Sequence, residues 1–154
     1  MELSDLLCEE SVLVCADIRS KAELLQKLSQ KAAELTGMDA ETILAALTAR
    51  EALGSTGIGN GIAIPHGKLP GLPTVRGIFV KLEEPIEFDA IDDQKVDIVV
   101  MLLAPVGAGA DHLKALARVA RLLRTESLVE QLRQTSDKKR LREMLIEPPA
   151  AHAA

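Results

Sequence analysis

Residues 57–67 read Gly-Ile-Gly-Asn-Gly-Ile-Ala-Ile-Pro-His-Gly and are the most informative stretch of this 154-residue sequence. Glycine at this density indicates a loop with unusual backbone angles, or a close approach of the backbone to another group. The apolar residues that follow the loop predict a short strand over residues 61–65. Because Pro65 lacks the N–H that a sheet ladder requires, we expect the strand to stop there and to present His66 at its end.

A histidine at a strand end, beside a loop rich in glycine, is suited to carrying an anionic group. The neutral imidazole of His66 is a competent nucleophile toward phosphorus, and its ordinary pKa lies near neutral pH. The glycine amides of residues 54–61 could converge on phosphate oxygens with no side chain in the way. The alternative interpretation assigns no chemical role to these residues: the glycine loop would be a flexible connector, and His66 would be an ordinary loop histidine.

Composition narrows the classes of partner. The formal net charge is −5, the chain has no Trp or Tyr, and its only aromatic carbocycles are Phe79 and Phe88. The negative charge of the protein would repel the phosphate backbone of a nucleic acid, and the chain has few aromatic side chains on which bases could stack. We therefore expect no nucleic-acid partner. The longest apolar run, residues 98–106, is too short to cross a membrane, and the acidic start of the chain does not resemble a secretory signal. Cys8 and Cys15 fit neither zinc nor redox spacing, which favours reduced thiols in the cytoplasm.

Strand and helix patterns alternate along the chain and predict a single α/β domain, with a mixed sheet and helices on both faces. Ser20 with Glu23 forms a predicted capping box, and Asp39 is expected to cap a second helix. Expected strands cover residues 12–15, 61–65, 75–82 and 96–103, and later helices cover about 111–124, 126–134 and 137–147. The stretch 96–103 is apolar enough to be central. We expect the domain to span residues 1–148, followed by a disordered tail over 149–154.

The stretch Gly54 to Leu69, GSTGIGNGIAIPHGKL, follows Arg50-Glu51-Ala52-Leu53 and resembles the active-site signature of one family. This family is the type-2 IIA domain of the bacterial phosphoenolpyruvate-dependent phosphotransferase system (PTS), and the resemblance is strongest to its nitrogen-regulatory branch, IIA-Ntr. It extends to residues 85–92, 96–99 and 111–113. It implies a mixed sheet flanked by helices, with the active histidine at a strand edge, in agreement with the prediction from the residues.

The resemblance implies that three residues are catalytic. His66 would be the phosphohistidine intermediate, Arg50 would lie beside it and compensate phosphoryl charge, and His112 would be a second active-site imidazole. A simpler interpretation makes Arg50 a cation that offsets a helix dipole. In the corresponding interpretation of His112, the ring packs on the apolar side of its helix, with Asp111 as the cap.

The predicted phosphate-binding loop consists of Ser55, Thr56, Gly57, Gly59, Asn60 and Gly61. It lacks the Gly-Lys-Ser/Thr of a P-loop, so we expect no nucleotide, and we predict no other cofactor. A zinc site formed by His66, His112 and a carboxylate such as Asp111 is the alternative, but no local spacing supports it, and we predict no metal. The acidic stretch 83–97 is interpreted as a solvated loop.

The predicted function is a phosphoryl relay in which a histidine-containing phosphocarrier protein phosphorylates His66. The chain would then be a phosphotransferase component rather than a metabolic enzyme. The resemblance implies control of partner proteins in nitrogen and potassium homeostasis, such as potassium-transport or sensor-kinase proteins. One alternative is a sugar-specific IIA component, of the fructose or mannitol type, that passes phosphate to a IIB domain. Another is a binding module without covalent chemistry.

Overall fold

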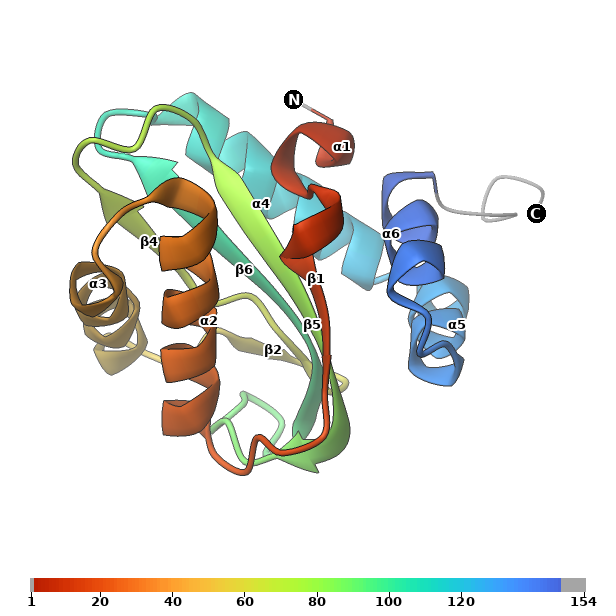
Figure 1. The fold of residues 1–154 in the computed structure, drawn as a ribbon. Helices are drawn as coiled ribbons and strands as arrows, with labels where there is room; N and C mark the ends of the chain where they lie inside the picture. Colours follow the sequence, from red (N-terminus) through yellow and green to blue (C-terminus); the bar gives the residue numbers. More distant parts are fainter. Residues whose placement is uncertain (1, 148–154) are drawn as a thin grey trace.

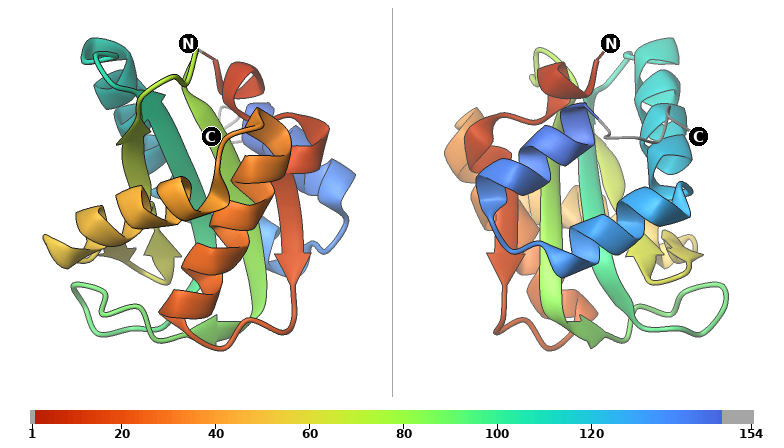
Figure 2. Two further views of the ribbon diagram at one scale, coloured as in Figure 1. Left: turned by 60° about the vertical axis from the view of Figure 1, so that its left-hand side comes forward. Right: turned by 90° about the vertical axis from the view of Figure 1, so that its right-hand side faces the viewer.

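The computed structural model describes residues 2–147 and contains one six-stranded mixed sheet with helices on both faces (Figures 1 and 2). The strand order is β1 (Val12–Cys15), β5 (Arg76–Ile86), β6 (Val96–Pro105), β3 (Ile62–Ala63) and β2 (Gly57–Gly59), and β4 (His66–Leu69) also pairs with β6. β5 and β6 are antiparallel, whereas β1 is parallel to β5, and β3 and β4 are parallel to β6. The predicted fold class is confirmed, and β6 is central as its apolar sequence indicated.

Helices cover the sheet from both sides. They are α1 (Leu3–Leu6), α2 (Lys21–Thr36), α3 (Ala40–Ala52), α4 (Ala110–Leu123), α5 (Glu126–Gln134) and α6 (Lys138–Ile146), with a 3-10 turn η1 (Glu9–Ser11). Figure 2 shows α2 and α3 on one face and α5 and α6 on the other. The sequence did not predict α1 or η1, which are too short for a helical period to show.

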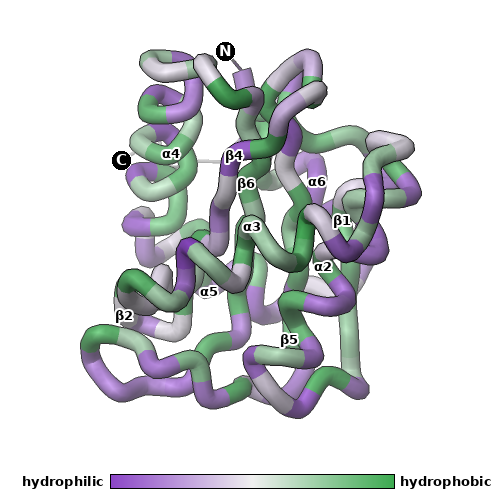
Figure 3. The backbone as a smooth tube through the Cα atoms, turned by 90° about the vertical axis from the view of Figure 1, so that its left-hand side faces the viewer, coloured by the Kyte–Doolittle hydropathy of each residue, from purple (hydrophilic) through white to green (hydrophobic). Residues whose placement is uncertain are grey.

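Strand β6 supplies both apolar cores of the molecule. Side chains alternate across a strand, so successive apolar residues enter opposite faces. Val99 and Met101 pack in the core that contains residues of α2 and α3, whereas Val100 and Leu102 pack in the core that contains residues of α4, α5 and α6. In Figure 3, hydrophobic and hydrophilic segments alternate along α4, as expected for a helix with one buried face.

Both predicted helix caps are present. The Ser20 hydroxyl accepts from the Glu23 amide at 3.1 Å, and the Asp39 carboxylate accepts from the Thr42 amide at 3.0 Å. The capping box is incomplete, because the Glu23 carboxylate accepts from the amide of Arg19 rather than that of Ser20. These caps determine where α2 and α3 begin.

His66 begins strand β4 and does not end the preceding strand, which corrects the sequence prediction. The pairing register of β3 with β6 continues unchanged into β4, with His66 opposite Leu102. The ladder is interrupted at Ile64 and Pro65 because proline has no N–H, although the Pro65 carbonyl still accepts from the Leu102 amide at 2.9 Å. His66 is therefore held at the start of a strand that pairs with the central strand.

The segment before His66 is an ordered hairpin, where the sequence suggested only a loop. β2 and β3 pair antiparallel, and Asn60 and Gly61 form the turn between them with φ of 56° and 79°. Two consecutive residues with positive φ are typical of the type I′ turn that matches strand twist, and Asn-Gly is its preferred sequence.

The acidic stretch 83–97 is also more structured than predicted, because β5 extends to Ile86. No helix among residues 2–147 combines the length and the apolar character needed to span a bilayer. The predicted tail, residues 149–154, lies outside the described residues together with His152, so the domain boundary at residue 148 remains a prediction.

Candidate active site

The ring of His66 is held by a backbone carbonyl that selects one tautomer. Its Nδ1 lies 2.8 Å from the carbonyl oxygen of Ile64. A carbonyl can only accept a hydrogen bond, so Nδ1 carries the proton and donates it. In the neutral ring the lone pair is then on Nε2, which makes Nε2 the nucleophilic atom.

Arg50 contacts that same nitrogen. Its Nε–H donates to His66 Nε2 at 3.2 Å, and its Nη1 donates to the carbonyl of Gly54 at 2.9 Å. A guanidinium has donors only, so this contact independently requires Nε2 to be an acceptor. Arg50 lies in the last turn of α3, where it also suits the helix dipole, but its side chain is directed to His66.

The electrostatic surroundings keep His66 neutral. Burial lowers the pKa of the half-buried ring below its usual value, and the nearby Arg50 guanidinium lowers it further, against the opposing effect of the bond to Ile64. A neutral imidazole is the form that can attack phosphorus.

His112 is the second imidazole of the site. It is only 5% exposed, and its ring centroid lies 5.6 Å from that of His66, with the planes tilted by 52°. Burial, followed by the proximity of His66, lowers the pKa of His112 below its usual value. Asp111 does not cap α4, as the packing interpretation of His112 supposed, because the cap position is Gly109 and Asp111 lies inside the first turn.

The tautomer of His112 follows from its surroundings. Nδ1 is buried and has no hydrogen-bond partner among the described residues. A buried N–H without an acceptor is rarer in proteins than an acceptor without a donor, so the proton belongs on Nε2. His112 then has an N–H donor at Nε2 in a ring that lies beside that of His66.

The predicted phosphate-binding loop is not an open cradle of amides. The amide and hydroxyl of Thr56 donate to the Glu51 carboxylate, and the amide of Gly57 donates to the Ser55 hydroxyl. That hydroxyl itself donates to the carbonyl of Phe88, and the amide of Asn60 donates to Asp92. These donors are used within the protein and stabilise the hairpin and the residues before it.

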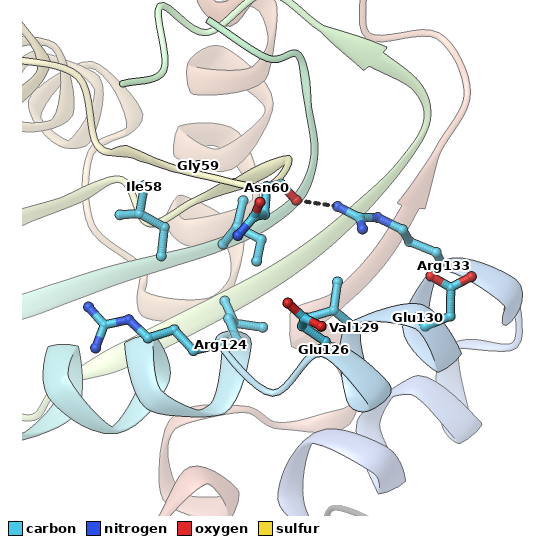
Figure 4. A pocket seen from close by; sticks show the side chains of 10 residues that line it. Ile58, Gly59, Asn60, Arg124, Glu126, Val129, Glu130 and Arg133 are labelled. Carbon is cyan, nitrogen blue, oxygen red and sulfur yellow. Dashed lines mark hydrogen bonds between the residues drawn. The ribbon is translucent and has the colours of Figure 1, made fainter. Parts of the chain in front are cut away.

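Close packing restricts two glycines of the loop, Gly57 and Gly61. A Cβ on Gly57 would lie 2.8 Å from the Cβ of Ala90, and one on Gly61 would lie 2.5 Å from Nη2 of Arg133. Arg133 in α5 donates to the carbonyl of Asn60 (Figure 4). It also forms an ion pair with Asp97 at 3.0 Å. At Gly57 and Gly61 the glycine therefore reflects close approach of the hairpin to its neighbours.

A pocket of about 470 Å³ lies between this hairpin and the helices α4 and α5 (Figure 4). Arg124, Glu126 and Glu130 line it, but neither imidazole does. Within residues 2–147, no three or more His, Cys, Asp or Glu side chains are grouped so that they could hold a metal ion.

Sequence reasoning missed the role of Glu51. Its carboxylate is buried and accepts from Lys21 Nζ at 2.9 Å and from the Thr56 amide at 3.1 Å. The sequence does carry a signal for this burial, since Glu51 continues the four-residue spacing of the buried Ile43 and Leu47 along α3. A carboxylate in such a stripe requires partners.

Comparison with known proteins agrees with this fold. Residues 5–147 match the family described as "Phosphoenolpyruvate-dependent sugar phosphotransferase system, EIIA 2". A nitrogen regulatory protein from Bradyrhizobium diazoefficiens is 48% identical over 153 residues, which cover 99% of this chain and 100% of the relative. One from Escherichia coli is 40% identical over 147 residues, covering 94% of this chain and 90% of the relative.

A solved structure shows the same architecture. The crystal structure of the nitrogen regulatory protein IIA-Ntr from Neisseria meningitidis has a TM-score of 0.88 and 31% identity, and the match covers 93% of this chain and 98% of that one. The resemblance seen in the motif around His66 is confirmed along nearly the whole sequence. The chain therefore belongs to the EIIA 2 family of the phosphoenolpyruvate-dependent sugar phosphotransferase system.

Proposed function

We propose that this chain is a phosphoryl-relay protein of the nitrogen-related phosphotransferase system. It accepts a phosphoryl group on His66 from a histidine-containing phosphocarrier protein and regulates partner proteins by its phosphorylation state. The observation that supports this most strongly is the tautomer of His66. The proton is on Nδ1, which donates to the Ile64 carbonyl, and the lone pair on Nε2 lies beside the Arg50 guanidinium.

The chemical step requires no cofactor. The lone pair of His66 Nε2 forms the new P–N bond as the P–N bond of the donor phosphohistidine breaks, and that electron pair returns to the donor imidazole. The proton stays on Nδ1, which donates it to the Ile64 carbonyl in a hydrogen bond, and this bond stabilises the positive charge that develops on the ring. During the transfer, the Nε–H of Arg50 stops donating to His66 Nε2 and donates instead to the oxygens of the transferred group. Negative charge accumulates on these oxygens in a loose transition state. His112 supplies a second donor.

Regulation would follow from the added charge. A phosphoryl group adds about −1.5 to −2 charges at neutral pH, which a partner can sense as attraction or repulsion. The similarity to nitrogen regulatory proteins supports regulatory targets, and we propose potassium-transport or sensor-kinase proteins as their class. The proposed setting is the cytoplasm, where a phosphocarrier would meet the chain.

The direct test is phosphorylation with phosphoenolpyruvate, the first enzyme of the relay and its phosphocarrier. We expect one acid-labile, base-stable phosphate per chain, detected by intact-mass spectrometry, and none on His66→Ala. A reaction without the phosphocarrier controls for non-specific labelling. Full labelling of His66→Ala would refute the proposal.

The family description, which names a sugar phosphotransferase system, favours one second candidate. A sugar-specific IIA component would pass its phosphate to a IIB-type protein. Pull-downs from cell extract, with the wild type and with His66→Ala as bait, separate the two functions. Recovery of a IIB-type protein to which phosphate passes rapidly would make the chain a transport component, whereas partners that bind one phosphorylation state selectively support regulation.

A further inference from the structure

Glu51 occupies a position that costs stability. It lies in the last turn of α3 with only 9% of its surface exposed. A carboxylate at a helix C-terminus opposes the helix dipole, and its burial removes it from water. A well-packed apolar residue at such a site is often neutral or stabilising. Stability alone therefore does not explain the presence of this carboxylate.

Three donors from two other segments satisfy the Glu51 carboxylate. Lys21, the first residue of α2, places Nζ 2.9 Å from Oε1 and also lies 4.5 Å from the centroid of the Phe88 ring. The amide and the hydroxyl of Thr56 complete the set. The result is a fixed connection from α2, through the end of α3, to the residue before β2.

This connection closes the same loop that orients Arg50. Nη1 of Arg50 donates to the carbonyl of Gly54, and the amide of Gly54 donates to the Glu51 carbonyl. Two adjacent side chains thus hold residues 50–56 in one conformation. Arg50 does so by its hydrogen bond to Gly54, and Glu51 by its hydrogen bonds to Thr56. Any shift of Gly54 would move the guanidinium whose Nε contacts His66.

We propose that Glu51 is a positioning residue for phosphoryl transfer: through Thr56 it fixes the loop that aims Arg50 at His66 Nε2. Its effect on transfer rests on the function proposed above. Glu51 itself does not contact His66 or the transferred group. Lys21 holds the carboxylate in place, and its ion pair allows the charge to be buried.

The test compares Thr56→Val with Thr56→Ser. Valine keeps the shape of threonine but removes the hydroxyl donor, whereas serine keeps the donor, and neither changes the charge of Glu51. An NMR titration gives the pKa of His66 in each unmodified protein. If the loop loosens, Arg50 moves away and the ring gains solvent, and both changes raise the pKa of His66 toward its ordinary value. A purely electrostatic role for Glu51 would leave that pKa unchanged in both variants.

We expect Thr56→Val to raise the pKa of His66 and to slow phosphorylation, and Thr56→Ser to match the wild type. Glu51→Ala should slow phosphorylation by about 10²-fold, the cost of a misplacement of roughly 1 Å. Glu41 is an exposed carboxylate on the same helix, so Glu41→Gln is the control and should leave the rate of phosphorylation unchanged. Identical His66 pKa values and transfer rates for Thr56→Val and Thr56→Ser would overturn the inference. The titration requires no phosphoryl donor, so if the wild type accepts no phosphate, the proposed function fails while the positioning role is still tested.

Discussion

The reactivity of His66 depends on two neighbours that act on opposite sides of its ring. The Ile64 carbonyl holds the proton on Nδ1, and Arg50 contacts the lone pair on Nε2. The sequence indicated the importance of His66 through the glycines and proline around it. It could not indicate the tautomer, because that depends on which way a backbone carbonyl two residues away points.

The neutral state of His66 leads to a prediction on pH. Burial lowers the pKa of His66 below the ordinary histidine value of 6.5, so the ring stays unprotonated at and somewhat below that pH. We therefore expect the rate of phosphorylation to fall in acidic solution, with its midpoint below pH 6.5. The phosphocarrier also carries a histidine, which can contribute to the pH dependence of the rate. Titration of the His66 ring protons by NMR, without the phosphocarrier, measures the midpoint of His66 alone. A midpoint above 6.5 would be inconsistent with the buried geometry.

A second residue-scale prediction concerns His112. His112→Gln keeps similar bulk, so the fold should persist, but its flexible amide does not hold a donor at the place where the rigid ring holds Nε2–H. Loss of one such donor typically slows a reaction by about 10²–10³-fold. Rapid-quench phosphorylation measures the rate, and Arg121→Gln, an exposed change on the same helix, is the control. Unchanged kinetics in both directions of transfer would leave His112 a packing residue.

At the scale of elements, local signals predicted some segments well and others poorly. The helices with caps, α2 and α3, began where Ser20 and Asp39 indicated, because a cap is a contact within four residues. The glycine density predicts a loop before His66 where the structure has a hairpin, although Asn60-Gly61 is the preferred sequence of a two-residue turn. Its partners Asp92 and Arg133 are distant in sequence, and no local pattern reveals them.

The hairpin tip yields a prediction with a matched control. Gly61 and Gly71 have similar φ, 79° and 86°, but a Cβ on Gly61 would meet Arg133 and Asp97, whereas one on Gly71 would meet nothing within 4 Å. Gly71→Ala should cost about 1–2 kcal/mol of unfolding free energy for the left-handed conformation. Gly61→Ala should cost more, because the ion pair must also shift. Urea denaturation followed by circular dichroism measures both, and equal losses would show that the ion pair does not restrain the turn.

At the scale of the whole molecule, the site lies where elements from both faces of the sheet meet. Arg50 comes from the end of α3 on one face, His112 from the start of α4 on the other, and His66 from the strand paired with β6. Residues 16 and 46 positions from His66 converge only because of this topology. Their convergence could be expected from resemblance to a family but not from spacing.

A molecule-scale prediction concerns how phosphorylation is transmitted. Arg50 and His112 already lie at His66, so we expect little backbone movement when phosphate is added and a signal confined to charge at the surface. Backbone amide shifts should therefore change mainly near His66. A partner whose binding face is centred there should discriminate the two states by roughly 1–3 kcal/mol, measured by calorimetry on each form. Shift changes throughout α5 and α6 would indicate a conformational switch instead.

The most direct test of the central claim is the identity of the nitrogen that carries the phosphate. Long-range proton–nitrogen correlation spectra of the phosphorylated, ¹⁵N-histidine-labelled protein resolve both nitrogens of each ring. The tautomer held by Ile64 predicts phosphorus coupling to Nε2 of His66, with Nδ1 still protonated. Phosphate on Nδ1 of His66, or on His112, would show that His66 Nε2 is not the nucleophile.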